Sequence, residues 1–103
     1  MSQLDYRLED RRCYLSGELS FDSVAQSEEL LRSLSGLKGD ITLSFAEVTH
    51  ADSAATALMV EAYRRVSLAG GELRFEDIPQ HLLSVLAMTR LDTFLPIHTP
   101  SSP

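Results

Sequence analysis

The sequence predicts an α/β fold in which an open, mixed β-sheet starts with a hairpin and then alternates helices with strands. Two runs of alternating apolar and polar residues open the chain, as expected for paired strands. Three later segments carry apolar residues at helical spacing, and strand-like runs separate them. Because parallel neighbours in a sheet need a helix to return the chain, we expect the helices to pack against the sheet.

The first third of the chain is expected to form the hairpin and one helix. Apolar residues alternate with charged ones from Leu4 to Leu8, and Cys13-Tyr14-Leu15 resumes the apolar pattern. We expect Ser16-Gly17-Glu18-Leu19 to leave the sheet, and Ser20 or Asp22 to cap the helix that follows. The residues of this helix that face the core are Val24, Leu30, Leu31 and Leu34.

The central segment is a strand, a tight turn and a helix, and the rest of the chain is organised around it. The strand begins at Asp40, the turn is Asp52-Ser53, and the helix stops at Gly70-Gly71. Both turn residues are favourable N-caps, so one of their side-chain oxygens should accept a hydrogen bond from the first helical turn, worth about 1 kcal/mol. The turn therefore places small polar side chains at the positive end of a helix dipole.

A further strand, a third helix and a short apolar piece complete the predicted domain. Leu73 and Phe75 begin the strand, and Pro79 suits the first position of the helix. The apolar residues of this helix are Leu82, Leu83, Val85, Leu86 and Met88, and the apolar piece is Phe94-Leu95-Pro96-Ile97. No repeat or linker divides the chain, so we expect a single domain over residues 1–97 and a disordered tail over residues 98–103.

Composition excludes several classes of protein. The chain has 103 residues, 44% of them hydrophobic, and no apolar run approaches the roughly 20 residues that cross a bilayer. Its first residues lack the features of a signal peptide, which favours a cytoplasmic protein. With 9 basic and 15 acidic side chains, the net charge of −6 repels nucleic-acid phosphates and anionic lipids. Since the basic residues cluster no further than Arg11-Arg12 and Arg64-Arg65, we expect neither nucleic-acid binding nor direct membrane insertion.

No cluster of residues supports catalysis, a metal site or a cofactor site. His50, His81 and His98 lie in different predicted elements, with no Cys or acidic residue at metal-ligand spacing. The chain has no glycine-rich phosphate loop, and Cys13 is expected to be a small buried hydrophobe. His50 flanks the central turn, where it is either a contact residue or a half-exposed strand end, and the other two histidines are expected on the surface. We therefore predict no enzyme activity, no metal and no cofactor.

Two features of the central segment point to protein binding. Ser53 is either an N-cap only, or a contact or phosphorylation position whose neighbouring backbone amides can receive a phosphate. The outer face of the helix is too apolar for a solvated surface, so it is either a docking surface or buried beneath the C-terminal piece. That outer face consists of Ala57, Val60, Arg64, Ser67 and Leu68, flanked by Tyr63. The opposite face, expected to meet the sheet, consists of Ala55, Leu58, Met59, Ala62, Val66 and Ala69.

Four motifs, in this order and spacing, resemble those of the STAS domain family. They are Leu15-Ser16-Gly17-Glu18-Leu19, Asp52-Ser53-Ala54-Ala55, Ala69-Gly70-Gly71-Glu72-Leu73 and Pro79. The resemblance covers residues 4 to 97. It implies an open sheet with helices packed against it, and a partner-binding surface made of the central turn and the helix behind it.

The central turn resembles one branch of that family more than another. Antagonists of anti-sigma kinases carry an Asp-Ser-Ser-Gly-like turn that is phosphorylated on the second hydroxyl residue, and that position is Ala54 here. The STAS subunit of the Mla phospholipid-transport ABC system carries an Asp-Thr-Gly-Gly-like turn, with a hydroxyl residue first and a small one second, which is the pattern of Ser53-Ala54. Ala55 departs from the glycine of both branches, and Thr56 stands where a Leu is common.

The resemblance therefore implies a non-enzymatic cytoplasmic protein that is similar to the Mla STAS subunit and lies at the inner membrane through its partner. That partner is the ATPase subunit of a phospholipid-transport ABC complex, with its permease and lipid-binding subunit, which acts in outer-membrane lipid asymmetry. The implied contact residues are His50, Asp52, Ser53, Ala54, Thr56, Ala57, Val60 and Arg64. The alternative is an anti-sigma-factor antagonist that switches partners, binds an anti-sigma factor kinase and is released by phosphorylation at Ser53 or Thr56.

Overall fold

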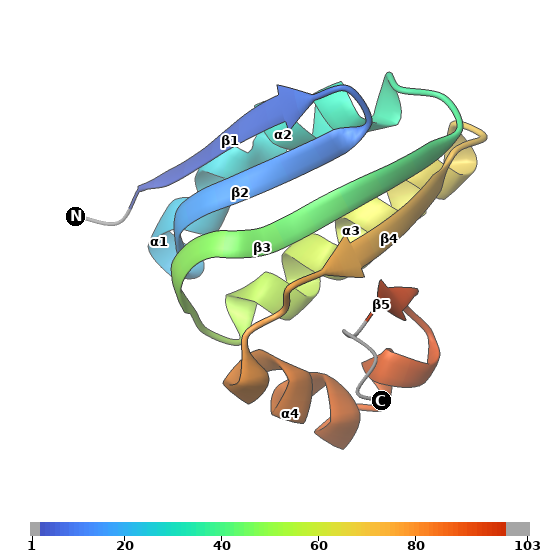
Figure 1. The fold of residues 1–103 in the computed structure, drawn as a ribbon. Coiled ribbons are helices and arrows are strands. Elements are labelled where there is room, and N and C mark those ends of the chain that lie inside the picture. The colour runs from blue at the N-terminus through green and yellow to red at the C-terminus, as the bar shows by residue number, and fades with distance from the viewer. Residues whose placement is uncertain (1–2, 99–103) are drawn as a thin grey trace.

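The computed structural model describes residues 3–98, which form one five-stranded sheet with α2 and α3 packed on one face (Figure 1). The strands, in their order along the sheet, are β1 (Leu4–Glu9), β2 (Arg12–Leu19), β3 (Asp40–Ala51), β4 (Glu72–Glu76) and β5 (Ile97–His98). The helices are α1 (Phe21–Val24), α2 (Glu28–Ser35), α3 (Ala54–Leu68) and α4 (Gln80–Met88), with short 3-10 helices η1 (Ala25–Ser27) and η2 (Leu91–Thr93). The strand β1 is antiparallel to β2, and every other pair is parallel. The predicted open, mixed α/β sheet is confirmed.

The hydrophobic core lies between the sheet and the helices α2 and α3. The rings of Phe45 on β3 and Phe75 on β4 lie 6.4 Å apart between centroids, and both side chains are buried. Cys13 on β2 is fully buried in the same cluster, as the sequence predicts. Burial raises the pKa of its thiol to about 12, so this cysteine is an inert core residue.

The strand β2 is longer than the sequence predicts. Residues 16–19 do not leave the sheet, because β2 continues to Leu19 and Gly17 pairs with Leu4 on one side and Val48 on the other. Gly17 has a φ of 90°, and a Cβ atom there would clash with the carbonyl oxygen of Gln3. Glycine therefore allows the strand to pass an irregular point where any other residue would be strained.

The first predicted helix is divided into α1, η1 and α2. Ser20 is its N-cap, and the Ser20 amide donates to the Ser23 hydroxyl at 2.8 Å. Ser23 and Ser27 are buried, and the Ser27 hydroxyl donates to the carbonyl oxygen of Val24 at 2.6 Å. Such hydroxyl bonds to nearby backbone compete with regular helical hydrogen bonding, which accounts for the division.

The helix α3 buries the face that the sequence assigns to the sheet. Ala55, Leu58, Met59, Ala62 and Val66 are all buried, and Ala69 is half-buried at the C-terminal end. Gly70 follows with a φ of 92°, so it supplies the left-handed geometry that ends the helix, as predicted.

The helix α4 is confirmed, but it begins one residue later than the sequence predicts. Pro79 is the N-cap and the helix begins at Gln80. Among the apolar residues that predict this helix, Leu82 and Leu86 are buried, whereas Met88 is 78% exposed. Met88 lies two residues after Leu86, which turns its side chain about 200° around the helix and away from the core.

The C-terminal piece returns to the sheet as β5. Leu95 is buried, and Ile97 and His98 pair with Phe75 and Glu76 of β4. His98 therefore belongs to a strand, although the sequence places it in the tail, and the rest of that predicted tail lies outside the described residues. Within residues 3–98, no helix is long and apolar enough to cross a membrane.

Candidate functional site

The turn between β3 and α3 is built around Asp52. The Asp52 amide donates to the carbonyl oxygen of Leu19 at 2.9 Å, which ties the turn to the end of β2. The Asp52 carboxylate accepts from the Ala54 amide at 2.8 Å, so Asp52 supplies the predicted capping oxygen of α3. Ser53 is the residue before the helix, but its hydroxyl makes no hydrogen bond to any of residues 3–98. The interpretation of Ser53 as a side-chain cap is therefore wrong.

The hydroxyl groups of the turn differ in their availability. Ser53 is exposed, whereas Ala54 and Ala55 are buried against the core. The Thr56 hydroxyl donates to the carbonyl oxygen of Ser53 at 2.7 Å, so it is already engaged in the first turn of α3. Ser53 is thus the residue of this turn whose hydroxyl can bond a partner without first losing a bond to its own chain.

The outer face of α3 is largely open. Ala57 and Arg64 are exposed, Leu68 is 75% exposed, and Val60 is half-buried against the core. The C-terminal piece meets the flank of this helix, where the ring of Phe94 contacts that of Tyr63 edge-on at 5.3 Å between centroids. The outer face is therefore not buried beneath the C-terminal piece, and the alternative that the sequence left open is wrong.

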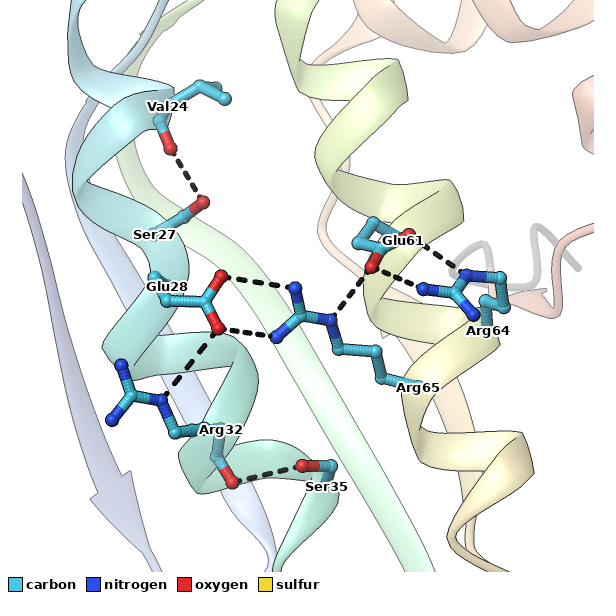
Figure 2. Close-up of polar contacts among 8 residues, drawn as sticks. All are labelled: Val24, Ser27, Glu28, Arg32, Ser35, Glu61, Arg64 and Arg65. Carbon is cyan, nitrogen blue, oxygen red and sulfur yellow. Dashed lines mark hydrogen bonds and ion pairs between the residues drawn. The ribbon is translucent and has the colours of Figure 1, made fainter.

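A cluster of ion pairs joins α2 to α3 beside this face (Figure 2). We call Glu28, Glu61, Arg64 and Arg65 the clamp. Arg65 donates to both carboxylate oxygens of Glu28, at 2.8 and 3.0 Å, and to Glu61 at 2.8 Å. Arg64 donates to Glu61 at 2.7 and 3.0 Å. The hydrogen bonds from Arg64 and Arg65 lower the pKa of Glu61 to about 2, and those from Arg65 lower the pKa of Glu28.

The histidines belong to three different elements, β3, α4 and β5. His50 is exposed near the end of β3, paired with Glu18 of β2 and two residues before Asp52. His81 is exposed as predicted, but its Nε2 atom lies 2.6 Å from the carbonyl oxygen of Ala51, where it must donate because a carbonyl only accepts. This contact attaches α4 to the base of the turn. Sequence reasoning missed it because the two residues are 30 positions apart.

The described part of the chain contains no cluster of metal-binding side chains. Residues 3–98 contain no group of three His, Cys, Asp or Glu side chains able to hold a metal ion. Every fully buried side-chain nitrogen or oxygen atom among these residues has a hydrogen-bond partner, so no buried polar group awaits a ligand.

Comparison with known families assigns the fold. The sequence model of the family described as "Mlab, STAS domain" matches residues 3–97. The chain belongs to the STAS domain family. This confirms the resemblance inferred from the four motifs. No curated protein matches the sequence.

Three solved structures share this STAS fold. A candidate anti-sigma factor antagonist from Thermotoga maritima matches with a TM-score of 0.73 at 20% identity, over 95% of this chain and 86% of that chain. The anti-sigma factor antagonist SpoIIAA in its unphosphorylated form matches with a TM-score of 0.72 at 14% identity, over 96% and 89% of the two chains. The Bacillus cell fate determinant SpoIIAA in the phosphorylated form matches with a TM-score of 0.62 at 17% identity, over 99% and 93%. At these identities the likeness shows the fold alone.

Proposed function

We propose that this STAS protein is a non-enzymatic subunit that binds and supports the ATPase of an Mla-type phospholipid-transport ABC complex. In this proposal it lies in the cytoplasm, held at the inner membrane by the ATPase, the permease and the lipid-binding subunit. STAS domains generally act as regulatory or binding domains, and the matching family description carries the Mla name. The pattern of Ser53 followed by Ala54 supports the same branch.

The observation that carries this proposal is the exposed Ser53 hydroxyl beside an open apolar face. Because Asp52 caps α3, the Ser53 hydroxyl is available to a partner. Ala57 follows one turn later and is exposed, so a partner helix could approach the backbone of α3 closely there. A hydroxyl next to small and aliphatic residues suits a contact with a polar group at its edge and apolar packing at its centre.

Co-purification of the full chain with the ATPase subunit tests the proposal. Ser53→Ala should weaken binding by about 1 to 3 kcal/mol, because the partner's polar group is left unpaired. Ala57→Glu should weaken it more, because it buries an unpaired charge in the contact. Ala57→Glu is a cleaner probe than Val60→Asp, since Val60 packs against the core and its replacement would also disturb the fold.

Matched controls lie on α4, beyond the His81 contact with the turn and outside the residues of the proposed surface. Ser84→Ala and Ala87→Glu change exposed residues of the same types and should bind like wild type. Thermal melts of each variant alone report whether the fold is kept. If Ser53→Ala and Ala57→Glu melt and co-purify like the wild-type chain, the turn and the outer face do not form the docking surface.

The second candidate function is that of an anti-sigma-factor antagonist that switches partners. Two of the matched structures are of SpoIIAA, in unphosphorylated and phosphorylated forms. In this chain Ala54 has no hydroxyl and Thr56 already donates its own, so phosphorylation would fall on Ser53. Intact-mass measurement after incubation with anti-sigma kinases and ATP decides between the two functions. Stoichiometric phosphate on Ser53 would favour partner switching, and an unmodified chain favours the transporter subunit.

A further inference from the structure

The clamp fixes the register of two neighbouring helical segments. The segment from α1 to α2 connects the parallel strands β2 and β3, and α3 connects the parallel strands β3 and β4, so both segments run in the same direction. Glu28 and Arg65 mark the same level on these segments, because the guanidinium of Arg65 bonds both carboxylate oxygens of Glu28 (Figure 2). Phe21 and Ala57 precede these two residues by seven and eight positions. Phe21 therefore lies roughly 12 Å from Glu28, and Ala57 roughly 12 Å from Arg65, toward the N-terminal ends of the segments.

A second contact brings the same ends together independently. Leu19 and Ala51 are register partners at the ends of β2 and β3, and the next residue, Asp52, donates to Leu19. Phe21 lies two residues beyond Leu19, and Ser53 lies two residues beyond Ala51. The helices α1 and α3 contact each other, and Figure 1 shows α1 beside the end of β3. Phe21 and Ser53 thus both follow the paired ends of β2 and β3, at one end of the sheet.

Phe21 adds a large apolar side chain to this end of the sheet. It is 75% exposed, although two later residues of the same helix contribute to the interior, with Ser23 buried and Val24 half-buried. Exposed Ala57 lies at the same level on α3, and Val60 follows it along the outer face. A single exposed aromatic residue is ordinary, but exposed aromatic and small apolar residues on two contacting helices suit the centre of a protein interface.

The clamp bounds this apolar surface on its C-terminal side. Its two carboxylates and two guanidinium groups satisfy one another, so a partner gains little by offering a charge there. A mutually neutralised polar rim beside an apolar centre fits a partner that supplies an apolar pocket together with one polar group for Ser53.

We propose that Phe21 is an anchor residue for the ATPase subunit, whose apolar pocket receives the Phe21 ring while Ser53 and Ala57 make the adjoining contact. This inference rests on the proposed function and deepens it. It extends the partner-binding surface from α3 to α1, so that two segments far apart in the sequence contact the same partner. Aromatic side chains that fill a pocket near the centre of an interface carry a large share of its binding energy.

Titration of the purified full chain with the purified ATPase subunit of an Mla-type transporter tests the anchor. Phe21→Ala should raise the Kd by about 10- to 100-fold. Phe21→Gln, which keeps the length of the side chain but not the ring, should do the same. Met88→Ala is the matched control, because Met88 is 78% exposed at the C-terminal end of α4, beyond the His81 contact with the turn, and its Kd should match that of wild type. Thermal melts should place all three variants near wild type, since an exposed side chain contributes little to the core.

The same titration distinguishes failure of the anchor from failure of the proposed function. If Ser53→Ala and Ala57→Glu raise the Kd while both Phe21 variants bind like wild type, the anchor is overturned and the proposed function stands. If the wild-type chain does not bind the ATPase subunit, the proposed function fails and the anchor falls with it. Light scattering addresses a third case: a wild-type dimer that becomes a monomer in Phe21→Ala would assign this surface to a second copy of the chain and overturn the anchor.

Discussion

In the central turn, the side chain of Asp52 caps α3 and that of Ser53 does not, because of the backbone geometry at Ser53. An N-cap residue whose side chain bonds the helix amides usually has an extended backbone. Ser53 instead has helical angles, with a φ of −63° and a ψ of −17°, so its side chain is turned away from the amides of α3. Asp52 precedes it and reaches the Ala54 amide. The exposed Ser53 hydroxyl is therefore a consequence of Asp52 doing the capping.

This division predicts unequal effects on stability. Asp52→Ala should lower the free energy of unfolding by about 1 kcal/mol, because the Ala54 amide loses its acceptor and the helix dipole loses a favourable charge. Ser53→Ala should change it by less than about 0.5 kcal/mol, as is usual for an exposed surface substitution. Urea unfolding followed by circular dichroism measures both. Asp52→Asn keeps an acceptor oxygen but loses the charge, so its decrease in the free energy of unfolding should lie between those of Asp52→Ala and Ser53→Ala. Equal destabilisation by the two alanine variants would mean that the Ser53 hydroxyl caps α3.

The sequence predicts which turn forms the candidate site, but not which side-chain atoms of that turn bond the helix. Both Asp and Ser are favoured N-caps, so residue type alone cannot choose between them, and the choice depends on backbone angles that the sequence does not reveal. Phe21 was not predicted as a site residue because a single apolar residue at a helix start carries no signal by itself. Its position at the same end of the sheet as Ser53 depends on hydrogen bonds between β2 and the turn, which join segments far apart in the chain.

At the scale of whole elements, the pattern of apolar residues predicts the types of the elements better than their limits. The predicted core face of α3 is confirmed. Its apolar residues repeat every 3.6 residues without interruption, so only one orientation of the helix buries them. The end of β2 is misplaced because Ser16-Gly17-Glu18 is typical of a turn, whereas the structure uses Gly17 inside the strand. The division of the first helix is also missed, since buried serine hydroxyls such as that of Ser27 look like solvated ones in the sequence.

The clamp between α2 and α3 predicts an acid-sensitive contribution to stability. The pKa of Glu61 is lowered from 4.5 to about 2 by its bonds to Arg64 and Arg65. A folded-state pKa below the unfolded value means that the contribution is present above about pH 4.5 and is lost as the pH falls toward 2. Glu61→Gln removes this contribution, so its melting temperature should fall less steeply than that of wild type between these pH values.

Differential scanning fluorimetry at low salt measures this pH dependence. Glu72→Gln is the control, because Glu72 is an exposed carboxylate on β4 outside the clamp, and it should keep the wild-type slope. Added salt should narrow the difference between wild type and Glu61→Gln, since exposed ion pairs are screened. Identical slopes for wild type and Glu61→Gln at low salt would show that the clamp contributes nothing to folding.

At the scale of the whole molecule, acidic groups outnumber and neutralise the basic ones. The net charge is −6. Ion pairs engage five of the arginines, which are Arg7, Arg12, Arg32, Arg64 and Arg65. On the polar side of the sheet, Arg7 also stacks 4.5 Å from the centroid of the Tyr14 ring, between this ring and Glu47. A surface of this kind presents no concentrated positive field to an anionic polymer or lipid.

The charge distribution predicts that any attachment to a membrane requires the partner. In sedimentation with vesicles that contain phosphatidylglycerol, the purified chain should stay in the supernatant even at low salt, where attraction of basic groups to the surface would be strongest. It should sediment once the vesicles carry the ATPase and permease subunits. A double variant, Glu28→Gln with Glu61→Gln, removes the carboxylates that neutralise Arg64 and Arg65, and any weak vesicle binding that it gains should disappear in salt. Salt-sensitive sedimentation of the wild-type chain alone would instead demonstrate direct contact with lipid, and the ATPase would no longer be needed to explain a position at the membrane.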